Sequence, residues 1–335
     1  MKREIIRIEQ SEITARIFGV GDAYVREIER AFGVDIRNRS EQSGDAIAVT
    51  GEDPERVGLA ARVIERLKDE ATNADVIPEQ RVSYIIGMIR DGDGGALETL
   101  DNSTICLTSR GKPVKAKTVG QKKYVEAIAK NTIVLGVGPA GTGKTFLAVA
   151  MAVKALRAGD VNRIVLTRPA IEAGEKLGFL PGDLQSKIDP YLRPLYDALH
   201  EMLGAENYAK MAEKGVIEVA PLAYMRGRTL DDSFIILDEA QNATPEQMKM
   251  FLTRLGFRSK AVVTGDLTQT DLPSGQKSGL AMAVKIIGGI DDIVIHQFSD
   301  RDVVRHKLVQ KIILAYERFE REQQQKFSNK KGNGK

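Results

Sequence analysis

The sequence predicts an α/β protein with a mostly parallel sheet, preceded by a small α+β domain. From Thr118 onward, short apolar segments alternate with helical patterns, which is typical of a parallel sheet with helices on both faces. Before that point, strands and helices follow one another in a different order and predict a separate unit. The length of 335 residues also favours two domains over one.

The first domain is predicted over residues 1–72. Its expected elements are a strand, a helix, two strands and a helix, at Ile5–Ile8, Ala23–Phe32, Val34–Asn38, Ala46–Thr50 and from Pro54. Residues 73–117 are predicted to be a connector, with one helix at Val82–Ile89. The connector ends in the basic segment Arg110–Lys117, which we expect to be solvated; a nucleic-acid contact is the alternative.

The second domain, residues 118–317, carries the alternating pattern. Its six predicted strands are Ile133–Val137, Ile164–Thr167, Ile217–Val219, Phe234–Leu237, Ala261–Thr264 and Ile293–Ile295. One helix has clear boundary signals, with Thr244 as N-cap, Gln247 completing a capping box, and Gly256 at the expected end. Residues 318–335 are polar and are predicted to be disordered.

Composition excludes several classes of protein. No apolar run reaches the 18 or more residues of a membrane span, and the N-terminus does not resemble a secretory signal, so we expect a cytoplasmic protein. The single cysteine, Cys106, excludes an internal disulfide framework and a cysteine-based zinc site. The formal charge of +3 favours no partner class, so a nucleic-acid surface would have to be a local patch.

A glycine-rich segment follows the first predicted strand of the second domain and matches the pattern G-x-x-x-x-G-K-S/T. Its residues are Gly138, Pro139, Ala140, Gly141, Thr142, Gly143, Lys144 and Thr145. Between a strand and a helix, such a loop cradles nucleotide phosphates with its backbone N–H groups. Lys144 is expected to reach the β- and γ-phosphate oxygens, and the Thr145 hydroxyl to ligate magnesium. The sequence therefore predicts a site for ATP and Mg²⁺.

Further motifs favour hydrolysis of that nucleotide. Asp238 ends a predicted strand and is expected to hold Mg²⁺, while Glu239 is placed to polarise an attacking water as general base. Gln269 could sense the γ-phosphate or the water; a simple turn at Gly265–Asp266 is the alternative. Gln121 is a candidate for selecting adenine through a bidentate pair, and the alternative is a surface helix residue.

The nucleotide motifs resemble those of superfamily-1 helicases, and several longer strings resemble the PhoH-like ATPases. The helicase-like motifs are Gly138–Thr145, Leu237–Gln241 and Gly265–Gln269. The PhoH-like strings, between about residues 117 and 317, are Leu166–Pro169, Glu172–Gly182, Tyr224–Thr229 and Asp302–His306. The resemblance implies one RecA-like ATPase core and a link to RNA metabolism. It also implies an association with a YbeY-type endoribonuclease and ribosomal RNA maturation.

Several arginines are candidates for further roles. Arg168 follows a predicted strand, and Arg226 and Arg228 flank a glycine, so these three are candidate RNA contacts. A single core lacks the second lobe that supplies an arginine to the γ-phosphate in helicases. Arg305, in one of the family-like strings, is the candidate for that role from a neighbouring subunit, so we expect a homo-oligomer such as a ring.

The first domain resembles a KH module in its element order and in the segment Phe18–Asp22. A KH loop reads Gly-x-x-Gly and clamps the nucleic-acid backbone, whereas Asp22 here replaces the final glycine. A carboxylate at that point repels phosphate. A KH-like fold is therefore expected, with RNA binding and protein contact as alternatives for its role.

Together these motifs predict Mg²⁺-dependent ATP hydrolysis coupled to RNA remodelling or RNA processing, including RNA helicase activity. One alternative is an ATP-switched assembly factor that recruits a nuclease or a ribosomal partner without unwinding. The other is an RNA-binding module whose P-loop only stabilises the fold. Glu239 argues against the last, because a purely structural nucleotide site needs no residue to activate water.

Overall fold

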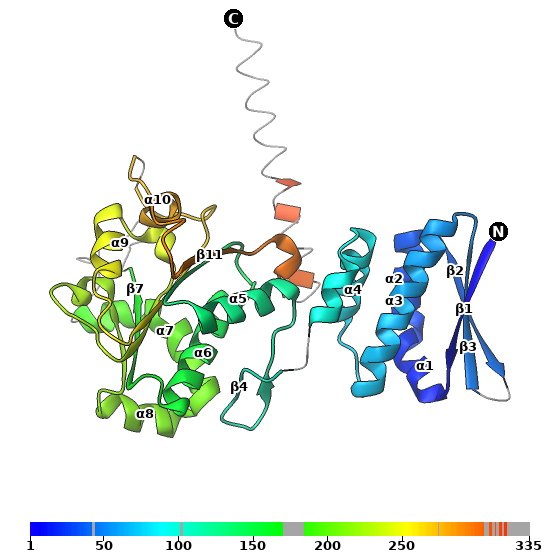
Figure 1. Ribbon diagram of the computed structural model, residues 1–335, viewed down its shortest axis with the longest axis horizontal. Helices are drawn as coiled ribbons and strands as arrows, with labels where there is room; N and C mark the ends of the chain where they lie inside the picture. The colour runs from blue at the N-terminus through cyan, green and yellow to red at the C-terminus, as the bar shows by residue number, and fades with distance from the viewer. Residues whose placement is uncertain are drawn as a thin grey trace, which may run out of the picture. The chain divides into compact units, whose positions relative to one another are not determined.

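The computed structural model describes residues 1–41, 44–100, 103–169, 184–273 and 275–304, with a few positions between 308 and 319. The chain divides into two compact units (Figure 1). One is Met1–Thr99 with Val304–Lys335, and the other is Leu100–Val303. Within the described ranges, no helix has both the length and the apolar character that a membrane crossing requires.

The first unit is a small α+β domain with an antiparallel sheet in the order β1-β3-β2. The strands are β1 (Lys2–Ile8), β2 (Asp35–Glu41) and β3 (Gly44–Gly51), and the helices on one face of the sheet are α1 (Ser11–Phe18), α2 (Ala23–Phe32) and α3 (Pro54–Asn73) (Figure 1). The predicted elements are confirmed, but α1 was not foreseen. It is only eight residues long and buries Ile13, Thr14 and Ile17, a pattern too short to stand out.

The turn between α1 and α2 has an unusual backbone. Gly19 and Gly21 have φ of 73° and 58°, and Asp22 has φ of 59° in the left-handed region. Few residues other than glycine adopt this conformation, although aspartate does so more readily than most. Asp22 thus has a backbone conformation that favours glycine, and it adds a carboxylate to this turn.

Helix α4 (Glu79–Arg90) lies in the segment predicted as a connector and packs against α2 and α3. Arg81 pairs with Glu70 of α3, and Ser83 Oγ donates to Glu27 Oε1 of α2 at 2.6 Å. The first compact unit therefore extends through the short helix η2 (Gly94–Thr99).

The second unit is built on a six-stranded parallel sheet in the order β11-β6-β10-β9-β7-β8. Its strands are β6 (Ile133–Val137), β7 (Arg163–Arg168), β8 (Ile217–Pro221), β9 (Ser233–Leu237), β10 (Lys260–Gly265) and β11 (Ile293–Gln297). All six predicted strands are confirmed, and so is the predicted α/β core with a parallel sheet. Strand β10 lies between β6, which precedes the glycine-rich loop, and β9, which precedes Asp238.

Alternate side chains of these strands enter two separate hydrophobic clusters, one on each face of the sheet. Ile164, Phe234 and Ile236 pack with α5 (Val119–Lys130), α6 (Lys144–Ala158) and α7 (Leu184–Leu203). On the other face, Ile235 and Leu237 pack with α9 (Pro245–Leu252) and α10 (Gly279–Ile286). Helix α8 (Ala205–Glu213) follows α7. The strands are apolar throughout because helices cover both faces.

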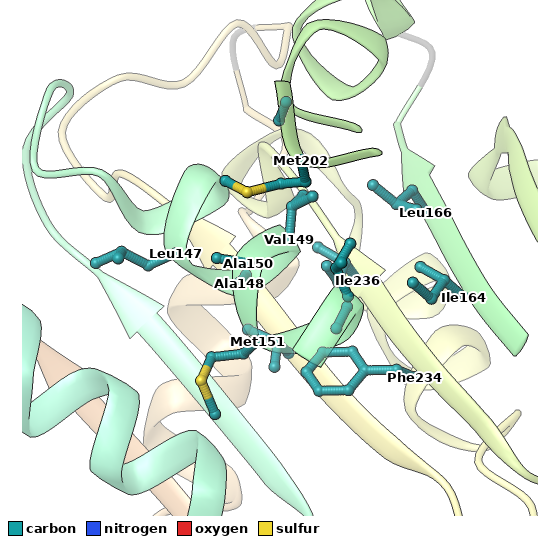
Figure 2. Packing of buried hydrophobic residues seen from close by; sticks show 14 of the residues in the cluster. Leu147, Ala148, Val149, Ala150, Met151, Ile164, Leu166, Met202, Phe234 and Ile236 are labelled. Atoms are coloured by element: carbon teal, nitrogen blue, oxygen red, sulfur yellow. The ribbon is translucent and has the colours of Figure 1, made fainter. Parts of the chain in front are cut away.

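Helix α6 is the centre of the first cluster (Figure 2). Every residue from 147 to 153 is buried, and the cluster that Figure 2 shows around this helix also contains Phe234, Ile236 and Met202. A helix that is apolar on all sides is held by the core around it. Its first turn, which carries Lys144 and Thr145, is therefore fixed relative to the sheet.

The basic segment forms part of a hairpin, β4 (Cys106–Leu107) and β5 (Pro113–Val114), and Ser109 N donates to Glu201 O at 2.9 Å. Its backbone is thus tied to the core, while Arg110 and Lys112 are exposed. The capping box of α9 is confirmed, but its predicted end at Gly256 is wrong.

Helix α9 ends at Leu252 because the chain turns away to pair with the segment that precedes β9. Leu255 forms a bridge with Leu230, and Gly256 N donates to Leu230 O at 3.0 Å. A side chain at Gly256 would overlap the backbone of Leu230 and Asp231. The glycine therefore permits a close approach of two segments and does not cap the helix.

Candidate nucleotide site

The loop of residues 138–143 joins β6 to α6 at the carboxyl edge of the sheet. Gly138, Gly141 and Gly143 have φ of 149°, 85° and 79°, values that favour glycine. A Cβ atom at Gly138 would lie 2.7 Å from both Cβ and O of Phe298. The loop is also tied to the neighbouring strand, since Gly138 N donates to Gly265 O at 3.1 Å. It therefore forms the compact turn that a phosphate-binding loop needs.

Lys144 holds its positive charge against this loop. Its Nζ donates to the carbonyl oxygens of Gly138 and Pro139 at 2.6 and 2.7 Å. The residue also begins α6, so its ammonium group and the positive end of the helix act on the same region. A triphosphate in the loop would meet both charges.

Two threonine hydroxyls converge on the buried carboxylate of Asp238, which directly follows β9. Thr145 Oγ1 and Thr264 Oγ1 donate to Asp238 Oδ1 at 2.6 and 2.7 Å, and Asp238 is 4% exposed. Hydroxyl and carboxylate oxygens are ligands that Mg²⁺ prefers. Thr145 and Asp238 are therefore the residues that would hold a magnesium ion. The contact of Thr264 with Asp238 was not predicted, because the sequence shows Thr264 only as the last residue of an apolar strand.

The structure places Glu239 in a constrained position. Its φ of 51° is left-handed, which is uncommon for a residue other than glycine. Glu239 Oε2 accepts from Gln241 Nε2 at 2.6 Å, and Oε1 lies 3.3 Å from a guanidinium nitrogen of Arg168. The side chain is 38% exposed, so water reaches it. The two adjacent carboxylates thus have different partners: Asp238 accepts hydrogen bonds from the two threonines, and Glu239 forms an ion pair with Arg168.

The loop after β10 is held by the short helix η5 (Ala240–Asn242). Gln241 Oε1 accepts from Asp266 N at 3.0 Å, and Asp266 Oδ1 accepts from Thr268 N at 2.9 Å. Through these two bonds, Asp266 anchors the loop that follows β10. Gln269 is exposed on the same loop, and its part in sensing phosphate or water stays a prediction.

Gln121 is buried at 4% exposure, so the alternative of a surface helix residue is wrong. Its Oε1 accepts from Lys117 N at 2.7 Å, and its Nε2 donates to Thr142 O at 3.0 Å. The amide therefore braces the glycine-rich loop. Selection of adenine by Gln121 stays a prediction.

An aromatic cluster lies beneath the loop. Tyr124 packs edge-on against Phe298, with ring centroids 5.1 Å apart, and its ring is tilted against that of His296, with centroids 5.6 Å apart. Burial raises the pKa of Tyr124, and the negative charge of Asp238 raises it further, so the phenol stays neutral. Burial lowers the pKa of His296 below its ordinary value, although the charge of Asp302 opposes the change. The cluster thus supports the loop with uncharged groups.

The predicted cationic residues have different environments. Arg228 makes two hydrogen bonds to Glu218, at 2.5 and 2.7 Å, which raise its pKa and match its charge. Arg168 NH1 donates to Tyr191 O at 2.8 Å, in addition to its ion pair with Glu239. Arg226 is exposed. Arg305 and the string Glu172–Gly182 lie outside the described residues.

A family model described as "PhoH-like protein" matches residues 113–317 of the chain. The chain belongs to the PhoH-like protein family. Curated PhoH-like relatives match beyond that region. The chain is 49% identical over 312 residues to a PhoH-like protein of Bacillus subtilis (strain 168), covering 93% of this chain and 96% of that protein. It is 54% identical over 313 residues to one of Mycobacterium tuberculosis (strain ATCC 25618 / H37Rv), covering 92% and 86%.

Other similarities of this PhoH-like chain are narrower. Protein PhoH of Escherichia coli (strain K12) is 47% identical over 206 residues, which cover 61% of this chain and 58% of that protein. Among solved structures, the Sulfolobus solfataricus SWI2/SNF2 ATPase core in complex with dsDNA is similar at 15% identity and a TM-score of 0.33. That match covers 55% of this chain and 44% of the solved chain, and a likeness so weak carries no argument about function.

Proposed function

We propose that this PhoH-like P-loop protein hydrolyses ATP with Mg²⁺ and couples hydrolysis to RNA remodelling or RNA processing. The observation that carries the first part is the convergence of the Thr145 and Thr264 hydroxyls on Asp238, at 2.6 and 2.7 Å. This cluster lies at the first turn of the P-loop helix and one residue from Glu239. Such an arrangement suits phosphoryl transfer to water.

Each residue then has a chemical part. Lys144 offsets the charge of the β- and γ-phosphate oxygens, and Thr145 and Asp238 would hold the magnesium ion. When bound, that ion supplies positive charge to the phosphate oxygens. Glu239 accepts a proton at its carboxylate from the attacking water as the bond between the γ-phosphorus and the bridging oxygen breaks. Its 38% exposure gives water access to the carboxylate.

Substitutions of the two central residues test hydrolysis. Lys144→Ala should weaken ATP binding and abolish phosphate release, because it removes the charge within the loop. Glu239→Gln should keep ATP binding and lower turnover about 100-fold or more, the contribution of a general base. Glu246→Gln, at an exposed glutamate in the first turn of α9, is the matched control. Turnover at the parent rate in Glu239→Gln would show that another group is the base.

The proposal of RNA as partner is supported by a turn at the carboxyl edge of the sheet. Helix η4 (Leu222–Met225) follows β8, and Leu222 and Met225 are buried at 1% and 0% exposure. Tyr224, 54% exposed, and Arg226 are presented by this anchored turn. An aromatic ring can stack on a base while an arginine meets phosphate, and neither interaction requires a sequence preference.

Binding of single-stranded RNA to the full chain tests this surface. Tyr224→Ala and Arg226→Ala should each weaken binding, and Arg226→Ala should also reduce the dependence on salt, because one fewer counterion is released. Arg228→Lys should have a smaller effect, because Glu218 already matches the charge at that position. RNA affinity that responds to substitution of Asp22 and not of Tyr224 would place the contact in the first unit instead.

The second unit contains one RecA-like sheet among the residues that the structure describes. A single core favours two further proposals: a homo-oligomer whose sites are completed by a neighbouring subunit, and an ATP-switched factor that recruits a partner without unwinding. A YbeY-type endoribonuclease and the ribosome are the proposed partners of such a switch. Strand displacement that requires ATP and is lost in Glu239→Gln would support the helicase over the switch.

A further inference from the structure

We infer that Arg168 and Gln241 are positioning residues that restrain the Glu239 carboxylate, and that a phosphate of single-stranded nucleic acid competes for Arg168 and frees Glu239 for hydrolysis. This inference rests on the proposed function, because it takes Glu239 as the general base. It adds a physical link between nucleic-acid binding and turnover.

Both oxygens of the Glu239 carboxylate are engaged. Arg168 lies 3.3 Å from Oε1, and the Gln241 amide donates to Oε2 at 2.6 Å. A general base must point an oxygen lone pair at the proton it removes. A carboxylate engaged at both oxygens is less free to turn toward a water molecule than one engaged at a single oxygen. The left-handed backbone of Glu239 is a strained conformation that surrounding contacts must maintain, in agreement with such a restraint.

Gln241 is a rigid partner. It is 3% exposed, and its Oε1 accepts from Asp266 N of the loop after β10 at 3.0 Å. With the amide oxygen fixed in this way, the Nε2 group must face Glu239. The next residue, Asn242, accepts from Asp271 N at 2.9 Å. Helix η5 therefore connects Glu239 to the loop that carries Gln269, the residue predicted to sense the γ-phosphate.

Arg168 is the exchangeable partner, because it lies between Glu239 and the exposed turn. It ends β7 and pairs in register with Pro221 of β8, and neighbouring strands lie about 4.8 Å apart. Helix η4, which carries Tyr224, starts at the next residue. In strand order, the carboxyl edge presents the turn after β8, then Arg168 after β7, then Glu239 after β9.

The chemistry of Arg168 permits the exchange. Its NH1 is anchored on Tyr191 O at 2.8 Å, which holds the guanidinium in place when its other partner changes. The side chains of the ion pair are 21% and 38% exposed, so solvent screens the attraction to Glu239. A guanidinium binds phosphate with two parallel hydrogen bonds, a geometry that suits a strand stacked on Tyr224.

Steady-state ATP hydrolysis with and without single-stranded oligouridylate tests the inference. Arg168→Ala should raise the basal kcat several-fold without a change in KM for ATP, and should reduce the stimulation by oligouridylate toward none. Arg168→Lys keeps a charge for Glu239 and for phosphate, so it should retain a low basal rate and part of the stimulation. Gln241→Ala should raise the basal kcat while stimulation through Arg168 persists.

Arg157→Ala is the matched control, because Arg157 also donates to backbone carbonyls but lies at the far end of α6 from Lys144. It should leave both the basal rate and the stimulation unchanged. ATP affinity and thermal melting establish that each variant is folded. If Arg168→Ala does not fold, Arg168→Lys decides the question through its stimulation ratio.

The outcomes separate this inference from the proposed function. A wild-type protein that does not hydrolyse ATP, or a Glu239→Gln variant with full turnover, removes the proposed function and the inference together. A hydrolysing wild type with an Arg168→Ala variant of lowered or unchanged basal kcat overturns the inference alone. So does a wild-type rate that oligouridylate does not change.

Discussion

Thr264 offers a direct test of the proposed magnesium site, because replacing it with valine removes one hydroxyl at nearly constant shape. The hydroxyl donates to Asp238 Oδ1 at 2.7 Å, and Thr264 is 0% exposed. Asp238 is itself 4% exposed, so bulk water has little access to replace the lost donor. Thr264→Val therefore leaves Thr145 as the remaining hydroxyl donor among these three residues.

The magnitude follows from the type of bond. A hydrogen bond to a charged group contributes about 1.5–3 kcal/mol, and each 1.4 kcal/mol or so corresponds to roughly a tenfold change in an equilibrium constant. If the bond orients Asp238 for the metal, Thr264→Val should raise the Mg²⁺ concentration for half-maximal hydrolysis by roughly tenfold to a hundredfold. The affinity for ATP without Mg²⁺ should change little, because the loop and Lys144 are untouched.

The assay is phosphate release during a Mg²⁺ titration, with nucleotide binding measured in parallel without the metal. Thr264→Ser is the matched control, since it keeps the hydroxyl and loses only a methyl group, and it should titrate close to the parent. The reasoning is refuted if Thr264→Val shows the parent Mg²⁺ dependence. It is also refuted if the serine variant shifts as far as the valine variant, because packing would then be the cause.

Three further outcomes are expected. Burial holds the pKa of His296 below its ordinary value of 6.5 in the folded protein, so the unfolded chain binds a proton at this ring more readily than the folded chain does. The stability that the neutral ring contributes is therefore present above pH 6.5 and is lost as the pH falls below it. In thermal melting, His296→Gln should lose less stability on acidification than the parent, and equal losses would contradict this. Gly138→Ala, with a Cβ atom 2.7 Å from Phe298 Cβ and O at a φ of 149°, should lower both the melting temperature and ATP affinity, and unchanged values would count against the close approach. Mixing Arg305→Ala with Lys144→Ala should restore part of the hydrolysis that each lacks if sites are shared between subunits, whereas no recovery after demonstrated subunit exchange would exclude shared sites.

The strands and the phosphate-binding loop were predictable because their signals are local. An apolar run such as Ile133–Val137 indicates a strand that is buried on both faces of a sheet, and this holds whichever strands lie next to it. In the segment Gly138–Thr145, the glycines permit the backbone conformation of the loop, and the first turn of α6 begins within the same segment. The capping box at Thr244 is also complete within four residues. Each pattern is decided by residues close in sequence.

Partners brought together across strands were not predictable in this way. Thr145 and Asp238, 93 positions apart, were both assigned to Mg²⁺ from their motifs, but Thr264 joins them only because β10 is inserted between β6 and β9. The same sheet order sets Arg168 beside Glu239. No local period or cap encodes which strands are neighbours, because packing and register select them over the whole core.

The sequence by itself therefore determined the chemical inventory of this protein: a phosphate loop, an acidic pair and a set of arginines. The tertiary structure decided the burial and the interaction partners of these residues. Arg228 is matched by Glu218, Gln121 is buried under the loop, and Glu239 is held by Gln241 and Arg168. A residue's type is written in the chain, but its burial and charge environment depend on side chains contributed by distant segments.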